Sequence, residues 1–153
     1  MWLQEPEWAC NNERIYQILN ISQTSLVASH FPSELSLLSS LRTLLVTRSY
    51  LRTTLLNQIP YELFGLTRLE TLGLVGTCLS GTIPSSIASF DNLSIFSVAY
   101  NALNGHIPET LGDMEKLYLL NLQNNQLSGS LSWRISGLKI LPILLWKTTI
   151  YQE

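Results

Sequence analysis

The chain has 153 residues, a formal net charge of -2 and 13% charged residues. An apolar content of 46% is that of an ordinary globular domain and excludes a disordered chain. Nine basic residues against 11 acidic ones exclude a strongly basic nucleic-acid-binding protein. The chain also contains 31 leucines. One ordinary core does not need so many residues of a single type, whereas a repeat that reuses one packing solution does.

Neither end of the chain resembles a targeting segment. Residues Met1–Glu7 have neither the basic start nor the apolar stretch of a secretory signal. The most apolar stretch, Ile135–Trp146, is shorter than the ~18–20 residues of a membrane span, and Lys139 and Pro142 interrupt it. We therefore expect neither an export signal nor a membrane anchor within these residues.

The dipeptide Ile-Pro recurs at a fixed interval through the middle of the chain. It occupies positions 59–60, 83–84 and 107–108, which are 24 residues apart each time. The glycines that keep the same interval are Gly81, Gly105 and Gly129. Proline suits the first turn of a helix, where its missing N–H is harmless, and glycine suits a sharp bend. A repeat of this length indicates a stacked architecture.

The apolar residues keep the same order within each copy and predict two kinds of local structure. A step of three residues, as in Leu63, Leu66 and Leu69, suits a 3₁₀ or irregular helical turn. The alternation that follows, as in Leu72 and Leu74, is typical of a short strand. The equivalent residues of the other copies are Leu35, Leu38, Leu41, Leu44, Val46, Leu51 and Leu55; Ile87, Phe90, Leu93, Phe96, Val98, Leu103 and Ile107; and Leu111, Met114, Leu117, Leu120, Leu122, Leu127 and Leu131. Each repeat is thus a strand, a turn and a short helical return, and the stacked copies predict an α/β solenoid with a parallel β-sheet along one face.

A polar residue follows each predicted strand, where the chain bends inward. Asn101 and Asn125 hold this position in two copies, and Thr77 holds it in the copy before them. A buried amide there can hydrogen bond backbone groups of its own repeat and of the neighbouring one. Leaving such groups unpaired would cost ~1–3 kcal/mol each. We therefore predict a structural ladder formed by Asn101, Asn125 and Thr77.

The repeat resembles the plant-type leucine-rich repeat, L-x-x-L-x-x-L-x-L-x-x-N-x-L-x-G-x-I-P. The stretch 111–129 and the Ile-Pro before it match this pattern almost position for position. The resemblance implies a right-handed superhelix of horseshoe shape, with the parallel β-sheet on its concave side and short 3₁₀ or irregular helical returns. It divides the chain into a degenerate N-terminal cap at 1–14 and leucine-rich repeats of 24 residues at 15–153, the last of them incomplete.

In the resembled family, outward residues around the strands bind partners. Mapped onto this chain, they form a nearly uncharged face that suits a protein, a peptide or a glycan better than nucleic acid. Gly73 and Ala99 are among the residues expected to point outward. Arg and Tyr are over-represented among residues that dominate binding energy. The ligand-binding candidates on the concave face are Arg48, Tyr50, Tyr100, Gln123 and Asn124.

Two N-x-S sequons, at Asn20 and Asn92, are candidate N-glycosylation sites if the chain enters a secretory pathway. By family resemblance we expect an extracellular or cell-surface protein, although an intracellular one is expected if both termini are genuine.

The residues do not favour catalysis. His30 and His106 fall in turn positions without an acid or nucleophile at a meaningful spacing. Cys10 and Cys78 lie several repeats apart, too far along a solenoid for a disulfide, and they form no metal-binding pair. We expect no catalytic residue, no metal and no cofactor in this chain, and a kinase domain outside it stays open.

The last repeat starts at Ile135 and stops before its Gly-x-Ile-Pro. An uncapped terminal repeat leaves an apolar edge open, which predicts self-association through the C-terminal edge. We interpret the chain as a non-catalytic recognition module, similar to a fragment of a receptor-like kinase or receptor-like protein ectodomain. Two alternatives stay open: a secreted protein similar to the polygalacturonase-inhibiting proteins, and a truncated structural repeat product with no ligand.

Overall fold

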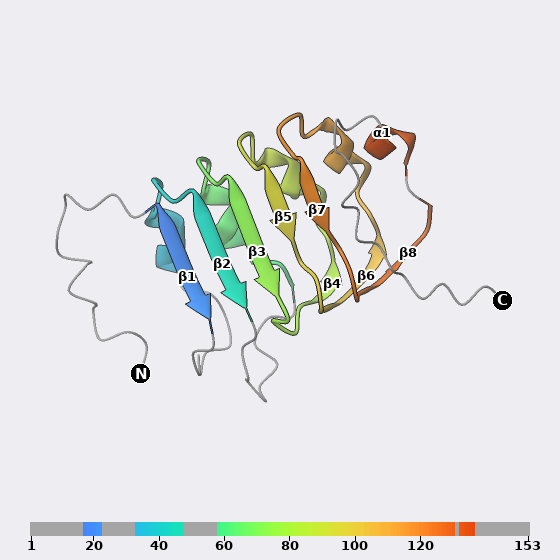
Figure 1. Ribbon diagram of the computed structural model, residues 1–153, viewed down its shortest axis with the longest axis horizontal. Helices are drawn as coiled ribbons and strands as arrows, with labels where there is room; N and C mark the ends of the chain where they lie inside the picture. Colours follow the sequence, from blue (N-terminus) through green and yellow to red (C-terminus); the bar gives the residue numbers. More distant parts are fainter. Residues whose placement is uncertain (1–16, 23–32, 48–57, 131, 137–153) are drawn as a thin grey trace.

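In the computed structural model each repeat makes one turn of a coil, and successive turns stack side by side (Figure 1). The structure describes residues 17–22, 33–47, 58–130 and 132–136. The predicted N-terminal cap at 1–14 lies outside the described residues, and so do Leu51, Leu55, Leu131 and the incomplete repeat beyond position 136.

Five parallel strands form the main sheet in the order β1-β2-β3-β5-β7. They are β1 (Ile18–Ser22), β2 (Thr43–Thr47), β3 (Thr71–Val75), β5 (Ile95–Ser97) and β7 (Leu119–Asn121). Equivalent positions of successive repeats lie opposite each other, so that Leu72 faces Phe96 and Phe96 faces Leu120. The strands are parallel because the chain returns to the same end of the sheet after every turn. The predicted solenoid with a parallel sheet along one face is confirmed.

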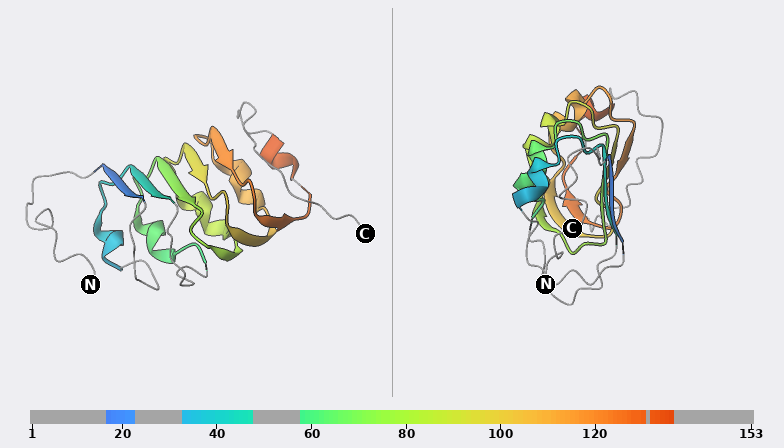
Figure 2. Two further views of the ribbon diagram at one scale, coloured as in Figure 1. Left: turned by 60° about the horizontal axis from the view of Figure 1, so that its bottom comes forward. Right: turned by 90° about the vertical axis from the view of Figure 1, so that its left-hand side faces the viewer.

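Short 3₁₀ helices line the side opposite the main sheet, as the view along the coil shows (Figure 2). They are η1 (Ser33–Leu37), η2 (Tyr61–Gly65), η3 (Ser85–Ser89) and η4 (Glu109–Asp113). Pro60, Pro84 and Pro108 directly precede the last three of these helices, with φ of -65°, -76° and -61°. A proline there needs no hydrogen-bond partner for its nitrogen and sets the φ that a helix needs. The predicted 3₁₀ returns are confirmed, although the return after position 131 is one α-helical turn, α1 (Trp133–Ser136).

A second parallel sheet, which the sequence analysis did not predict, runs along another side of the coil. It contains β4 (Ser80–Thr82), β6 (Ala102–His106) and β8 (Gln126–Ser128), in that order. The recurring glycines lie within or directly after these strands with left-handed backbone, at φ of 73° for Gly81, 74° for Gly105 and 83° for Gly129. They let the chain bend within or just after the second sheet, before it continues to the helical side, which is the sharp bend that the spacing predicted.

The apolar side chains of the repeat form one continuous core between the main sheet and the helical side. All seven predicted positions of the repeat that starts at Leu63 are buried: Leu63, Leu66, Leu69, Leu72, Leu74, Leu79 and Ile83. Two of the predicted positions elsewhere, Leu38 and Ile107, are only partly buried. Near the helical returns, the rings of Phe64 and Phe90 pack with their centroids 5.5 Å apart. The core passes from repeat to repeat without interruption, so each turn is stabilised mainly by its two neighbours. Within the described residues, every helix is too short or too polar to cross a membrane.

Replacing Gly105 with Ala is expected to destabilise the chain by about 1–2 kcal/mol, because a side chain in left-handed backbone is strained. The new Cβ would also lie 2.9 Å from Cγ2 of Thr82 in the preceding repeat. Urea unfolding followed by circular dichroism measures the loss. The double variant with Thr82→Ala removes the contact and keeps the strain, so it should recover only part of the loss. Full recovery would contradict the strain argument.

Candidate recognition face

The outer side of the main sheet, here called the sheet face, consists of the strand residues that point away from the core. In β2, Leu44 and Val46 are buried while Thr43, Leu45 and Thr47 between them are half-exposed. The same alternation continues in β5 and β7, where the central residue is buried and its two neighbours are not. This is the period-2 pattern of a sheet with one solvated side.

The parallel register aligns the outward residues in rows that cross the strands. One row runs through Ile18, Thr43, Thr71, Ile95 and Leu119, and the next runs through Asn20, Leu45, Gly73, Ser97 and Asn121. No strand of the main sheet contains a charged residue. The sheet face therefore combines hydroxyl and amide groups with the half-buried side chains of Ile95 and Leu119.

Gly73 lies on the sheet face but is covered. Its missing Cβ would lie 2.8 Å from Cδ2 of Leu45, so the leucine side chain of the previous repeat occupies this space. Ala99, which was expected to point outward, is only 1% exposed, so it offers no surface to a partner. Its backbone carbonyl accepts a hydrogen bond from the Gly76 N–H of the preceding repeat.

Asn101 cross-links its own repeat to the preceding one at the turn that follows β5. Its Oδ1 accepts hydrogen bonds from the backbone N–H groups of Thr77 (2.9 Å) and Leu79 (3.0 Å). Its Nδ2 donates to the carbonyl oxygens of Leu74 (2.7 Å) and Val98 (2.9 Å). One side chain thus pairs four backbone groups at the bend.

The other two ladder residues make related contacts. Asn125 donates from Nδ2 to the Val98 carbonyl at 2.9 Å and accepts at Oδ1 from the Leu103 N–H at 3.0 Å. Thr77 is buried, and its hydroxyl lies 3.2 Å from Oδ1 of Asn101. A hydroxyl has fewer hydrogen-bonding positions than an amide, so Thr77 connects fewer groups.

Three predicted ligand-binding residues lie together where the strands end. Tyr100 is 55% exposed, Asn124 is exposed, and Gln123 is half-buried. Nε2 of Gln123 lies 3.4 Å from the Tyr100 hydroxyl oxygen, to which it donates. Arg48 and Tyr50, the two other candidates, lie outside the described residues.

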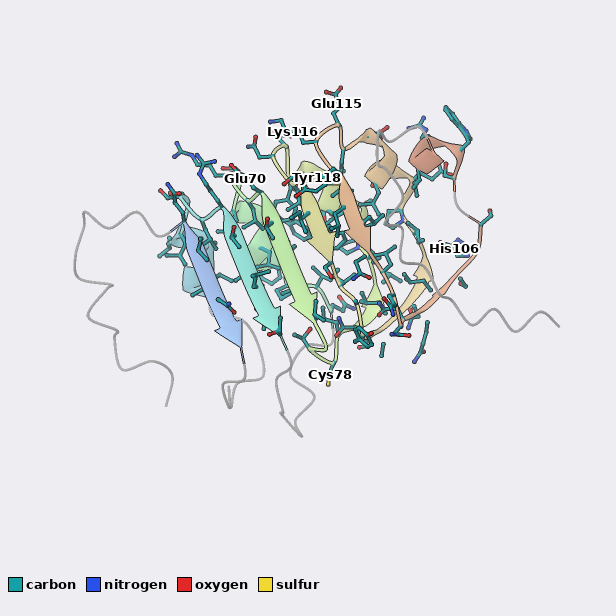
Figure 3. All side chains as sticks on the ribbon, viewed as in Figure 1. Glu70, Cys78, His106, Glu115, Lys116 and Tyr118 are labelled. Atoms are coloured by element: carbon teal, nitrogen blue, oxygen red, sulfur yellow. The ribbon has the colours of Figure 1, made fainter. Side chains whose placement is uncertain are left out.

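Charged side chains gather at the opposite, amino-terminal end of the strands. Figure 3 shows Glu70, Glu115 and Lys116 there, together with Tyr118, while Cys78 lies at the carboxyl end. Arg42 forms an exposed ion pair with Glu70, a kind of contact that contributes little stability. Within the described residues, the two ends of the strands therefore differ in chemistry, with charge at one end and neutral groups at the other.

The candidate glycosylation sites lie on different surfaces. Asn20 is exposed in β1 on the sheet face. Asn92 is half-exposed near the charged end, where Nδ2 donates to the Thr67 carbonyl at 3.1 Å and Oδ1 accepts from Lys116 Nζ at 2.6 Å.

The remaining candidates for chemistry stay separate. Across the described part of the chain, no three His, Cys, Asp or Glu side chains come close enough to hold a metal ion. Cys78 is a free, exposed thiol, and His106 is exposed with its ring against Gly129, away from the sheet face. His30 and Cys10 lie outside the described residues.

The binding candidates were chosen by residue type, so Ile95 and Leu119 were not among them. The signal that could have identified them is positional, because the parallel register places the two residues side by side in one outward row.

Comparison with known proteins agrees with this architecture. The model of the family described as Leucine Rich Repeat matches residues 116–138. The chain has the leucine-rich-repeat fold. No curated protein sequence shows a significant match to it.

Solved structures of plant leucine-rich-repeat ectodomains resemble the chain closely. A chain of the BIR3–SERK2 complex from Arabidopsis thaliana is 31% identical, with a TM-score of 0.68 over 77% of this chain and 61% of that one. The Arabidopsis receptor kinase HAESA, solved with the peptide hormone IDA and the co-receptor SERK1, is 27% identical, with a TM-score of 0.66 over 82% of this chain and 21% of that one. A plant ice-binding protein is 27% identical, with a TM-score of 0.68 over 78% of this chain and 37% of that one. The leucine-rich-repeat chain thus spans less than two thirds of the length of each of these structures.

Proposed function

We propose that this leucine-rich-repeat chain is a non-catalytic recognition module whose sheet face binds an uncharged, extended segment of a protein or peptide partner. The observation that carries the proposal is the composition of that face. Its strands hold no charged residue, and Ile95 and Leu119 lie side by side in neighbouring strands, half-buried and open to one side. The centres of protein interfaces are depleted of charge and enriched in apolar and aromatic groups in the same way.

The similar structures support this proposal. HAESA was solved with a peptide hormone and a co-receptor, and BIR3 was solved with SERK2. By the same likeness to receptor ectodomains, we propose that the chain works outside the cell or at its surface.

Selection of a displayed library of random linear peptides against the immobilised chain tests the proposal. Ser97→Lys places a charge in the middle of the sheet face, and we expect it to weaken binding of the selected peptides at least about tenfold, because the partner would bury that charge. Ser86→Lys is the matched control, since Ser86 is exposed in η3 of the same repeat on the opposite side. Equal binding by the two variants, or no enriched peptide at all, would refute the proposed face.

Secretion predicts glycosylation at Asn20 and Asn92. Attachment of a glycan to Nδ2 of Asn92 leaves one N–H on that nitrogen, so the hydrogen bond to Thr67 can persist. When the chain is expressed through a eukaryotic secretory pathway, we expect a glycosidase-sensitive mass shift, reduced by Asn92→Gln and retained in Ser94→Thr, which keeps the sequon. A secreted chain with unmodified Asn92 would contradict this prediction.

A further inference from the structure

Tyr100, Gln123 and Asn124 form a corner at the carboxyl end of the strands, here called the tyrosine corner. Two backbone hydrogen bonds hold the neighbouring repeats together at this point: the Tyr100 N–H donates to the Gln123 carbonyl at 2.8 Å, and the Asn101 N–H donates to the Asn124 carbonyl at 3.2 Å. Asn101 and Asn125 directly follow the exposed residues Tyr100 and Asn124, and their side chains hold the backbone here by hydrogen bonds. The corner is therefore a fixed element of the coil.

The backbone at the tyrosine corner is left-handed. Three successive repeats share this conformation at the equivalent position, but only one of them has glycine there. Gly76, Tyr100 and Asn124 occupy the same place in successive repeats, with φ of 67°, 58° and 54°. Glycine adopts this conformation freely, and asparagine tolerates it, but for tyrosine it is strained. The chain keeps an exposed aromatic ring at a place where glycine would fit better. Strain of this kind points to a role for the side chain itself.

The chemistry of the tyrosine corner is neutral. Gln123, which is half-buried, donates to the Tyr100 hydroxyl, and Asn124 is exposed beside them. The three stretches of chain that meet around it, 71–84, 95–108 and 119–130, contain no Asp, Glu, Lys or Arg in their sequence. A ligand that needs a charged partner, such as a phosphate, an acidic sugar or a basic peptide, finds none in these stretches.

We propose that the tyrosine corner binds a neutral oligosaccharide. The C–H face of a pyranose ring stacks on the Tyr100 ring, and the sugar hydroxyls exchange hydrogen bonds with the amides of Gln123 and Asn124. An amide both donates and accepts, as a hydroxyl does, so the two groups are complementary without any charge. A peptide anchor needs an apolar pocket, and Ala99, directly before Tyr100 in the chain, is only 1% exposed and offers no apolar surface for one. This site is separate from the strand rows proposed for a peptide partner.

Titration of the 153-residue chain with neutral oligosaccharides, namely cellohexaose, mannohexaose and a xyloglucan heptasaccharide, tests the proposal by calorimetry or ligand-observed NMR. Tyr100→Gly removes the ring and relieves the strain, and it copies Gly76 of the preceding repeat, so this variant is expected to fold. We expect at least one neutral sugar to bind the chain, and Tyr100→Gly to weaken that binding about tenfold or more. Tyr118→Ala is the matched control, because Tyr118 is exposed to 56% at the other end of the strands, and it should leave binding unchanged.

Tyr100→Phe keeps the ring and should retain most of the affinity. An oligogalacturonide of equal length, which is charged, should not compete. The proposal is overturned if none of the three neutral sugars binds, or if Tyr100→Gly binds as tightly as the unaltered chain. It is also overturned if Tyr118→Ala loses as much affinity as Tyr100→Gly. Peptide selection by the sheet face is measured separately, so one proposal can fail while the other stands.

Discussion

Replacing Asn101 with Ala is expected to lower the free energy of unfolding by about 2–4 kcal/mol, because the substitution removes both ends of a cross-link between repeats. The backbone N–H groups of Thr77 and Leu79 lose their acceptor, and the carbonyl of Leu74 loses its shortest hydrogen bond. The carbonyl of Val98 loses the same donor and keeps only the bond from Asn125. Urea unfolding followed by circular dichroism measures the loss.

Asn104→Ala is the matched control for Asn101→Ala. Asn104 has the same side chain three residues further on, but it is exposed in β6, so its loss should change stability by no more than about 0.5 kcal/mol. Asn101→Asp sharpens the test, because it keeps an acceptor for Thr77 and Leu79 while removing the donor to Leu74 and Val98. It should also be destabilising. If Asn101→Ala costs no more than Asn104→Ala, the proposed role of the ladder in stability is wrong.

Replacing Phe96 with Ala is expected to cost about 3–5 kcal/mol, the usual range for deleting a buried aromatic side chain. Phe96 is fully buried and lies between Leu72 and Leu120 of the neighbouring strands. The cavity would open at the contact between three repeats. Because such a solenoid is held together by neighbour contacts, amide hydrogen exchange should speed up first in β3, β5 and β7.

Ile95→Ala tests the same strand from its other side. Ile95 directly precedes Phe96 and is half-exposed on the sheet face, so its truncation should cost only about 1 kcal/mol. Because the side chains of a strand alternate, the difference between the two variants reports which side faces the core. A larger loss for Ile95→Ala than for Phe96→Ala would mean that the strand is turned the other way.

The repeat was predictable because the spacing of a few residue types along the chain indicates the fold of a solenoid. The 24-residue interval of Ile-Pro predicted where the helical returns begin, and Pro84 and Pro108 lie there. The pairs Leu72/Leu74 and Leu120/Leu122 predicted strand residues facing the core, and all four are buried. Each of these inferences depends on residues close together in the chain, where backbone preference and side-chain period act directly.

The binding candidates were only partly predictable, because their contacts join residues that are far apart in the chain. Tyr100, Gln123 and Asn124 were chosen by residue type and family resemblance, and the contact between Tyr100 and Gln123 depends on the stacking of two repeats. Ala99 was expected to point outward because of its place in the repeat, yet it is only 1% exposed. Its backbone carbonyl accepts a hydrogen bond from Gly76, 23 positions earlier in the chain, so its surroundings depend on the neighbouring repeat.

The sequence by itself determined that the chain is a leucine-rich-repeat coil, which side of each strand is buried, and where the helical returns start. Only the tertiary structure decided that residues 80–82, 102–106 and 126–128 pair as a second sheet, and that Leu45 covers Gly73. It also decided that Tyr100 lies beside the amides of the next repeat. The physical reason is that period and propensity act within one turn of the coil, whereas these contacts depend on how neighbouring turns stack against each other.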